Sequence, residues 1–389
     1  MAFGGRVAPN SGVGVTRTAP VEPRSGTLPK VWVLLGKGKG GNVQMLNLAN
    51  ALGWPFETRQ LHYNALNRIP NLLLGATRIS VDTGRSDALE PPWPDLVIAA
   101  SRRSAPVAKW IRKQSGGHTR LVHLFHTQAP LADYDLIITL PQYRLPQRSN
   151  ILHLSSALNR IPPTVLATAA ARWRDEFATL PRPHIALIVG GTSSSYVFDE
   201  GTASRLGREA SMVARAAGGA LLISTTPRTP NASAEALFAA VDVPAYRYRW
   251  RPDDADNPYF GFLALADRFI VTVDSASVPV EACATGKPVA LFEWPRRHPS
   301  SAWTRMLRRP PLRQLHGALL YLGLFKPARD FDAYHRTLRQ RGLISGLGEP
   351  LAEPRNALED GLGVAVERIR KLIEFPPDRS TSAGPSVLP

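Results

Sequence analysis

The chain has 389 residues, 44% of them hydrophobic and 20% charged, which indicates about two or three domains with apolar cores and excludes a disordered polyelectrolyte. Its single cysteine, Cys283, excludes an internal disulfide and a cysteine metal cluster, and fits a reducing compartment. The net charge of +16 favours an anionic partner such as a nucleotide diphosphate or a phospholipid surface, whereas no zinc-finger spacing or RNA-recognition motif supports nucleic acid.

The two ends of the chain differ in composition from its middle. Residues 1–29 are rich in Gly, Pro, Ser and Thr and lack the apolar stretch of a secretory signal, so they predict a disordered leader. Residues 376–389 predict a disordered tail. No apolar run approaches the roughly 18 residues that a bilayer requires, so we expect no transmembrane helix and a cytoplasmic protein, with peripheral attachment to the inner membrane left open.

Residues 30–160 alternate short apolar runs with helical patterns, which predicts a first Rossmann-like domain. The runs stand at 31–35, 95–100, 121–125 and 135–140. They are apolar throughout, as strands of a parallel sheet are when helices cover both faces. Helices are predicted over 43–52 and over 105–113, where Pro106 suits a first helical turn.

The second half repeats this scheme after a bridge. Residues 161–183 predict a linker helix, 184–310 a second Rossmann-like domain, and 311–375 C-terminal helices that partly return to the first domain. Strands of the second domain are expected at 185–189, 220–224, 269–273 and 288–292, with helices over 202–217 and 278–285. The predicted fold class is α/β, with two parallel-sheet domains facing a cleft.

Glycine-rich turns follow the first strand of each half. Such a turn can leave main-chain N–H groups unpaired and pointing outward, where they hold a phosphate or a sugar hydroxyl. In the second domain we therefore expect donor-binding residues at Gly190, Gly191, Thr192, Ser193 and Ser194. The alternative is that the glycines only permit a tight turn.

A second polar turn of the same domain joins the strand at 269–273 to a helix. Asp274, Ser275, Ala276 and Ser277 are expected to hold the diphosphate, and Glu281, about one turn into the helix, to take the ribose hydroxyls. The alternative is an ordinary N-cap followed by an exposed glutamate that the helix dipole stabilises. Two phosphate-compatible turns at one sheet edge favour the ligand.

The first domain offers a second set of polar groups at its own sheet edge. Its glycine turn lacks the Gly-Lys-Ser/Thr ending of a P-loop. We expect two groups of acceptor-binding residues. The first is Gly38, Gly40, Gly41, Asn42 and Gln44, and the second is Arg102, Arg103 and Ser104. The alternative for the second group is that its arginines are ordinary surface residues.

Histidine and aspartate supply the remaining candidates. His126 follows the strand at 121–125, where a general base is well placed. His123 lies two residues earlier in that strand. A purely structural role is the alternative for both histidines. The pairs Asp133/Asp135 and Asp254/Asp256 have the spacing of Mg²⁺ ligands in some transferases. We nevertheless expect no metal and no cofactor, because helix N-termini can stabilise the leaving diphosphate.

A basic stretch lies near the end of the second domain. Between Arg296 and Arg313 stand six arginines and no acid, with Trp303 and apolar residues among them. Basic residues mixed with tryptophan suit an anionic membrane surface, and a solvated loop is the alternative. The arginines are Arg296, Arg297, Arg305, Arg308, Arg309 and Arg313.

Several of these segments together resemble the mitochondrial-fission Elm-type family, over about residues 31–325. The segments are 92–98, 101–106, 126–128, 257–267, 274–277 and 281–288. The family is named after a plant protein associated with recruiting a dynamin-like fission protein, and it also occurs in alphaproteobacteria. The resemblance implies that a protein partner is conceivable as well as a small-molecule substrate.

The architecture also resembles that of the GT-B glycosyltransferases, including the lipid-linked N-acetylglucosamine transferase of peptidoglycan synthesis. The matching positions are Gly40–Asn42, His126–Gln128, Gly190–Thr192 and Glu281. This similarity implies that Glu281 contacts the donor ribose. Asn42 replaces a histidine that is a candidate base, and Thr127 replaces an acid, so His126 is the remaining candidate.

The resulting hypothesis is a GT-B-type glycosyltransferase that moves a sugar from a nucleotide-diphosphate donor to an envelope or lipid-linked acceptor. The alternative is a non-catalytic scaffold of the same fold that binds a partner protein or a membrane surface. A nucleotide-sugar epimerase is less well supported, because the chain has no Tyr-x-x-x-Lys pair and no acid at the end of the second strand.

Overall fold

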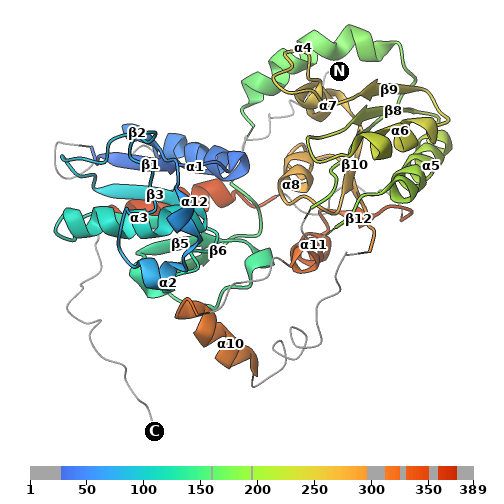
Figure 1. The fold of residues 1–389 in the computed structure, drawn as a ribbon. Helices are drawn as coiled ribbons and strands as arrows, with labels where there is room; N and C mark the ends of the chain where they lie inside the picture. Colours follow the sequence, from blue (N-terminus) through green and yellow to red (C-terminus); the bar gives the residue numbers. More distant parts are fainter. Residues whose placement is uncertain are drawn as a thin grey trace, which may run out of the picture.

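A computed structural model describes residues 28–158, 161–193, 196–295, 312–324, 330–349 and 358–374. They form two lobes, each built on a six-stranded sheet in which neighbouring strands are parallel (Figure 1). The predicted α/β class with two Rossmann-like domains is confirmed. Each lobe has its own core of buried apolar side chains.

The N-lobe sheet has the order β2-β1-β3-β4-β5-β6. Its strands are β1 (Val31–Leu35), β2 (Phe56–Gln60), β3 (Leu96–Ala100), β4 (Arg120–Leu124), β5 (Leu136–Thr139) and β6 (Ile151–His153). Its helices and 3₁₀ turns are α1 (Lys39–Leu52), η1 (Ala65–Arg68), α2 (Asn71–Leu74), α3 (Ser101–Gln114), η2 (Leu131–Asp133) and η3 (Pro141–Tyr143). The strand order reverses between β1 and β3, the position at which open α/β sheets bind ligands.

The C-lobe sheet has the order β12-β11-β10-β7-β8-β9, and its order reverses between β7 and β10. The strands are β7 (His184–Ile188), β8 (Ala220–Ser224), β9 (Ala245–Tyr248), β10 (Arg268–Thr272), β11 (Val289–Phe292) and β12 (Ser345–Gly346). The accompanying helices are α4 (Pro163–Ala178), α5 (Glu200–Ala216), α6 (Asn231–Ala239), α7 (Tyr259–Leu265), α8 (Ser277–Cys283) and α11 (Phe331–Gln340).

Two further helices of the C-terminal part of the chain lie with the N-lobe. α12 (Gly361–Glu374) packs against α1, and its Leu362, Ala365 and Ile369 belong to the N-lobe core (Figure 1). α10 (Leu312–Tyr321) contacts η2. The C-terminal part of the chain therefore contributes apolar side chains to the N-lobe.

α11 joins the two lobes near the carboxyl ends of their strands. On the C-lobe side, the Tyr334 hydroxyl donates to the Ala276 carbonyl at 3.0 Å. On the N-lobe side, the Asp330 N–H donates to the Gln142 carbonyl at 2.8 Å, and the Asp330 carboxylate lies 2.6 Å from Arg144. This contact fixes the Ala276 loop relative to η3.

The start of α3 differs from the sequence prediction. The helix begins at Ser101, so Pro106 lies in its second turn rather than its first, and the Arg102 carbonyl lacks the N–H that residue 106 would normally supply. The buried Asn71 side chain replaces that donor, because its Nδ2 lies 2.7 Å from the Arg102 oxygen. A tertiary contact thus allows the proline inside the helix.

None of the helices within the described ranges has the length and apolar character needed to cross a bilayer.

Candidate functional site

The two polar turns of the C-lobe meet where the strand order reverses. The Gly191 N–H, after β7, donates to Asp274 Oδ2, after β10, at 2.9 Å. The Gly190 N–H donates to Thr272 Oγ1 at 2.8 Å, and that hydroxyl donates to Asp274 Oδ1 at 2.7 Å. The structure therefore brings together the two loops that the sequence placed at one sheet edge.

The glycine turn does not present free donors, contrary to the prediction. In addition to Gly190 and Gly191, the Thr192 N–H donates to the Arg228 carbonyl at 3.1 Å, and the Ser193 N–H donates to the Tyr196 carbonyl at 2.9 Å. A Cβ at Gly190 would overlap the Asp274 carboxylate, and one at Gly191 would overlap the Arg228 main chain. The glycines are thus required for close approach, and the donor-binding role predicted for this turn stays a prediction. Ser194 lies outside the described residues.

Asp274 positions the loops instead of offering a free carboxylate. It is only 3% exposed, and its Oδ2 lies 2.5 Å from Nη1 of Arg228 in addition to accepting from Gly191. Arg228, which follows β8, keeps 41% of its side chain exposed. Sequence reasoning missed this arginine, although its position just after an apolar strand gave the same signal as the other loop residues.

Ser275, Ala276 and Ser277 keep the properties expected of an anion-binding turn. All three are partly buried at the start of α8. Within the described residues their N–H groups have no hydrogen-bond partner, while the Ser275 hydroxyl accepts from the Val278 N–H at 3.4 Å. Together with the Arg228 guanidinium across Asp274, they are the donors that this crevice offers.

Glu281 lies on α8 and is partly buried. Its Oε2 accepts a hydrogen bond from the Tyr259 hydroxyl on α7. Burial, and then the adjacent carboxylate, raise the pKa of Tyr259 well above its usual value, so the phenol stays protonated and donates. Tyr259 therefore orients Glu281, and the predicted ribose contact stays a prediction.

The N-lobe residues of the first glycine turn serve mainly internal contacts. Asn42 closes the turn, because its Oδ1 accepts from the Gly36 N–H at 3.1 Å and its Nδ2 donates to the Gly36 carbonyl at 2.7 Å. Gln44 is buried and accepts from the Leu158 N–H at 3.2 Å. A Cβ at Gly38 or Gly40 would meet open space, while one at Gly41 would contact Ala100 and Phe125.

The predicted acceptor group on α3 is corrected in two of its three members. Arg102 turns back to the carbonyls of Ile69 and Asn67, and Ser104 is buried with its hydroxyl on the Ala100 carbonyl at 2.6 Å. Both side chains are thus taken up in holding α3, and Arg103 alone is exposed. Ser101, which sequence reasoning left out, is exposed at the strand–helix turn with a φ of +73°, an uncommon conformation for serine.

His123, within β4, and His126, just after it, have different surroundings. His123 is fully buried, its Nε2 lies 3.1 Å from the Ser101 carbonyl, and burial lowers its pKa to about 4. It is a structural residue. His126 is partly buried, with its ring 5.2 Å from that of Tyr143, and it remains at the carboxyl edge of the N-lobe sheet as the candidate base.

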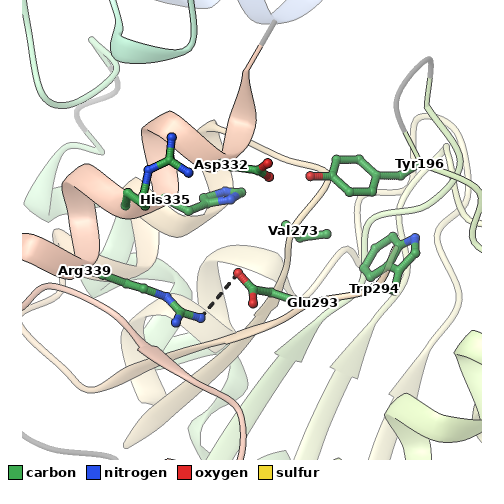
Figure 2. A pocket seen from close by; sticks show the side chains of 8 residues that line it. Tyr196, Val273, Glu293, Trp294, Asp332, His335 and Arg339 are labelled. Atoms are coloured by element: carbon green, nitrogen blue, oxygen red, sulfur yellow. Dashed lines mark ion pairs between the residues drawn. The ribbon is translucent and has the colours of Figure 1, made fainter. Parts of the chain in front are cut away.

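A pocket of about 370 Å³ lies beside the C-lobe crevice and was not predicted from the sequence (Figure 2). It adjoins the Asp274 loop through Val273, and Arg339 of α11 pairs with Glu293 across it at 3.3 Å. Figure 2 shows side chains from α11 facing those that follow β10 and β11. The lining residues are Tyr196, Val273, Glu293, Trp294, Asp332, His335, Arg336 and Arg339.

The aspartate pairs considered as metal ligands form ion pairs with basic residues instead. Asp133 pairs with Lys109 at 2.8 Å, Asp135 with Arg112 and Arg120, and Asp254 with Arg251 at 3.0 Å. The part of the chain that the structure describes contains no group of three His, Cys, Asp or Glu side chains arranged to hold a metal ion. The arginine-rich stretch 296–311 lies outside that part, as does the side chain of Arg313.

The sequence model for mitochondrial fission ELM1 matches residues 39–309, most of the chain. The chain belongs to the mitochondrial fission ELM1 family. The match begins within the first glycine turn and includes the second one, the Asp274 loop and Glu281, so the C-lobe crevice lies within the family's own region.

Among curated relatives of this ELM1-family chain, the mitochondrial fission protein ELM1 of Arabidopsis thaliana is 29% identical over 222 residues. That alignment covers 51% of this chain and about half, 52%, of the plant protein. The uncharacterized protein RP120 of Rickettsia prowazekii is 26% identical over 296 residues, which cover 67% of this chain and 82% of the rickettsial one.

Solved structures with a similar arrangement include the UDP-GlcNAc 2-epimerase of Neisseria meningitidis, with 11% identity and a TM-score of 0.44 over 88% of this ELM1-family chain and 99% of the other. A glycosyltransferase from Rickettsia africae has 12% identity and a TM-score of 0.43, over 90% and 99% of the two chains. These scores are low, and the fold assignment depends on the two sheets described above.

Proposed function

We propose that this ELM1-family protein is a metal-independent GT-B-type glycosyltransferase. The C-lobe would bind a nucleotide-diphosphate sugar, and the N-lobe would present an envelope or lipid-linked acceptor. The observation that supports this most is the crevice at the β7–β10 reversal, where Asp274 joins the Gly191 loop to Arg228 beside the unpartnered N–H groups of Ser275–Ser277. Crevices at such reversals are where open α/β sheets bind nucleotides.

The charges at this crevice suit a leaving nucleoside diphosphate. Negative charge develops on the departing diphosphate oxygen, and donors fixed in advance stabilise it without reorganising. Asp274 holds the Arg228 guanidinium in one direction while 41% of that side chain stays accessible. The N–H groups at the start of α8 would add hydrogen bonds. This set stabilises charge without requiring a metal ion.

Glu281 would fix the nucleoside end of the donor. Its Oε2 accepts from Tyr259, which holds the carboxylate in one rotamer at the side of α8. A carboxylate held in this way can take ribose hydroxyls with little loss of side-chain entropy. His126, at the facing sheet edge, would then be the general base toward the acceptor hydroxyl.

Isothermal titration of UDP and a panel of nucleotide sugars would test donor binding. We expect Ser277→Asp, which places a negative charge among the N–H groups, and Glu281→Gln each to weaken binding by about tenfold or more. The control is Glu235→Gln on α6, whose side chain is 69% exposed and pairs with Arg249 rather than with Asp274 or Arg228. Equal affinity of all four proteins for every nucleotide would exclude this crevice as the donor site.

The second candidate function is a scaffold that binds without catalysis. It is favoured by the N-lobe, where Asn42, Gln44, Arg102 and Ser104 are all engaged in internal contacts. A His126→Gln variant and the wild type should differ in sugar transfer or donor hydrolysis if the enzyme proposal holds. Nucleotide-sugar binding with no turnover in either protein would support the scaffold.

A further inference from the structure

The N-lobe segment 65–79 carries an exposed apolar surface that neither the crevice nor the pocket uses. Leu73 on α2 is 76% exposed, and its neighbours in the same segment are 44% to 55% exposed. These side chains, which we call the leucine patch, are Leu66, Leu72, Leu73 and Ile79. Exposed apolar side chains concentrated in one segment are candidates for contact with a partner or a membrane.

Hydrogen bonds hold this segment in place, so the fold itself fixes the exposure of the leucine patch. The buried Asn71 donates to the carbonyls of Arg102 and Thr127, both at 2.7 Å. Asn64 Nδ2 donates to the Ile79 carbonyl at 2.8 Å, and Arg102 Nη1 donates to that of Ile69 at 3.1 Å. With Asn71 and Leu74 directed inward, Leu72 and Leu73 are left pointing to solvent.

The charged side chains within the segment that carries the leucine patch have one sign. Between Leu61 and Val81 the chain contains no aspartate or glutamate, and its charged residues, Arg68 and Arg78, are exposed. Arg78 is held over the Trp110 ring at 4.7 Å, and Arg103, just beyond the Arg102 anchor, is exposed as well. An apolar surface bordered by arginines is complementary to an anionic lipid headgroup layer over hydrocarbon.

A second apolar element flanks the same loop. α10 and the turn after it expose Leu315, Leu322 and Leu324, and residues 312–324 contain no acid. Gly323 packs against the main chain of Ala129 and Pro130, while Asn71 holds Thr127 of that loop from the α2 side. α2 and α10 lie on the same side of the N-lobe in Figure 1.

We infer that the leucine patch docks on an anionic phospholipid surface, with Leu72 and Leu73 entering the headgroup–acyl boundary and Arg68 and Arg78 meeting the lipid phosphates. A lipid surface fits better than a protein partner, because leucine is under-represented among the residues that dominate protein interfaces, whereas aromatic residues are enriched there. The patch consists of exposed leucine and isoleucine side chains without an aromatic residue: Leu72 and Leu73 lie on α2, Leu66 on η1 and Ile79 in the turn that follows α2. This docking does not depend on whether the protein transfers sugar.

Flotation of the full chain with vesicles tests the inference. Wild type is expected to float with vesicles of phosphatidylcholine and phosphatidylglycerol, and far less with phosphatidylcholine alone. Leu72→Glu/Leu73→Glu should reduce the bound fraction by about tenfold or more. The matched control, Met212→Glu/Val364→Glu, makes the same charge change at two exposed apolar side chains of α5 and α12 and should bind like wild type.

A fluorescence measurement locates the contact directly. Cys283 is buried, and burial raises its pKa to about 12, so it will not compete for a thiol-reactive probe. An environment-sensitive dye on Leu73→Cys should shift to shorter wavelength with anionic vesicles, and the same dye on Met212→Cys should not. Wild-type failure to float, equal binding of both double variants, or an unshifted dye at residue 73 would each overturn the inference.

Discussion

Asp274 Oδ2 accepts the Gly191 N–H at 2.9 Å and lies 2.5 Å from Nη1 of Arg228, so one buried carboxylate connects the loops that follow β7, β8 and β10. The donors of the crevice are therefore positioned by a group that a ligand does not need to touch. Because the carboxylate is almost fully buried, its contacts are worth more than those of a surface pair.

Replacing Asp274 should lower the stability of the C-lobe. Asp274→Ala leaves the buried Gly191 N–H and the Thr272 hydroxyl proton without an acceptor, although the Thr272 oxygen still accepts from the Gly190 N–H, and each unsatisfied donor costs about 1–3 kcal/mol. We expect a loss of about 2–4 kcal/mol in the free energy of unfolding, measured by urea denaturation. Asp242→Ala, at a carboxylate that is 67% exposed and pairs with Arg215, should lower the free energy of unfolding much less. Similar losses in both variants would contradict this role.

Two glycine-to-alanine substitutions should act in opposite directions. Gly190→Ala places a methyl group into the Asp274 carboxylate and should cost about 2 kcal/mol or more. Gly40→Ala, in α1 with open space around its Cβ, should leave stability unchanged or raise it by up to about 1 kcal/mol. Thermal denaturation of the two variants would decide. A neutral Gly190→Ala variant would show that the β7 turn can yield.

A double-mutant cycle can test whether the Asn71 side chain replaces the main-chain N–H that Pro106 lacks. Asn71→Ala removes the partners of two carbonyls and should cost about 2 kcal/mol. In Asn71→Ala/Pro106→Ala, the new N–H at residue 106 can donate to the Arg102 carbonyl, so the double variant should be more stable than additivity predicts. Additive effects in urea denaturation would mean that Asn71 acts only through Thr127.

His123 should make stability depend on pH. Burial lowers its pKa from 6.5 to about 4, so between these values the unfolded chain binds a proton that the folded protein does not. The free energy of unfolding should therefore fall as pH is lowered from about 6.5 to about 4, by up to about 1.4 kcal/mol per pH unit, with no further change from this group below about 4.

The measurement is urea denaturation at pH 7 and pH 5. His123→Gln should be less stable at pH 7 but should lose less stability on acidification than wild type does. His118→Gln, at an exposed histidine, serves as the control and should follow the wild-type profile. An unchanged pH dependence in His123→Gln would show that other groups cause the acid sensitivity.

The strands that the sequence predicts are the inner ones. The apolar runs predicted at 31–35, 95–100, 185–189 and 269–273 correspond to β1, β3, β7 and β10. These strands lie between two neighbours and are covered on both faces, so nearly every residue is buried. The four strands that it misses, β2, β6, β9 and β12, are the edges of the two sheets. β2 reads Phe-Glu-Thr-Arg-Gln and keeps polar groups at an exposed edge, while β6 and β12 have three and two residues. A polar edge strand and a strand of two or three residues both have the sequence pattern of a loop.

The candidate site, like the sheets, has one part that the sequence predicts and one part that it does not. The sequence places Gly190, Gly191 and Asp274 at one sheet edge, because parallel strands end together. It cannot reveal that the glycine N–H groups are already bonded, since their partners, Thr272 and Asp274, come from β10 and the loop after it. The Thr192 N–H is likewise bonded to the Arg228 carbonyl, in the loop after β8. The same reason hides the role of Asn71 and the internal use of Arg102.

The position of α12 has a consequence for synthesis on the ribosome. Leu362, Ala365 and Ile369 complete the N-lobe core beside α1, yet they are translated after the entire C-lobe. The nascent first lobe must therefore wait, with one apolar side of α1 uncovered, until the last helix emerges. Chaperones would be expected to meet that uncovered side, and the C-lobe to finish folding first, in reverse of the order in which the lobes are made.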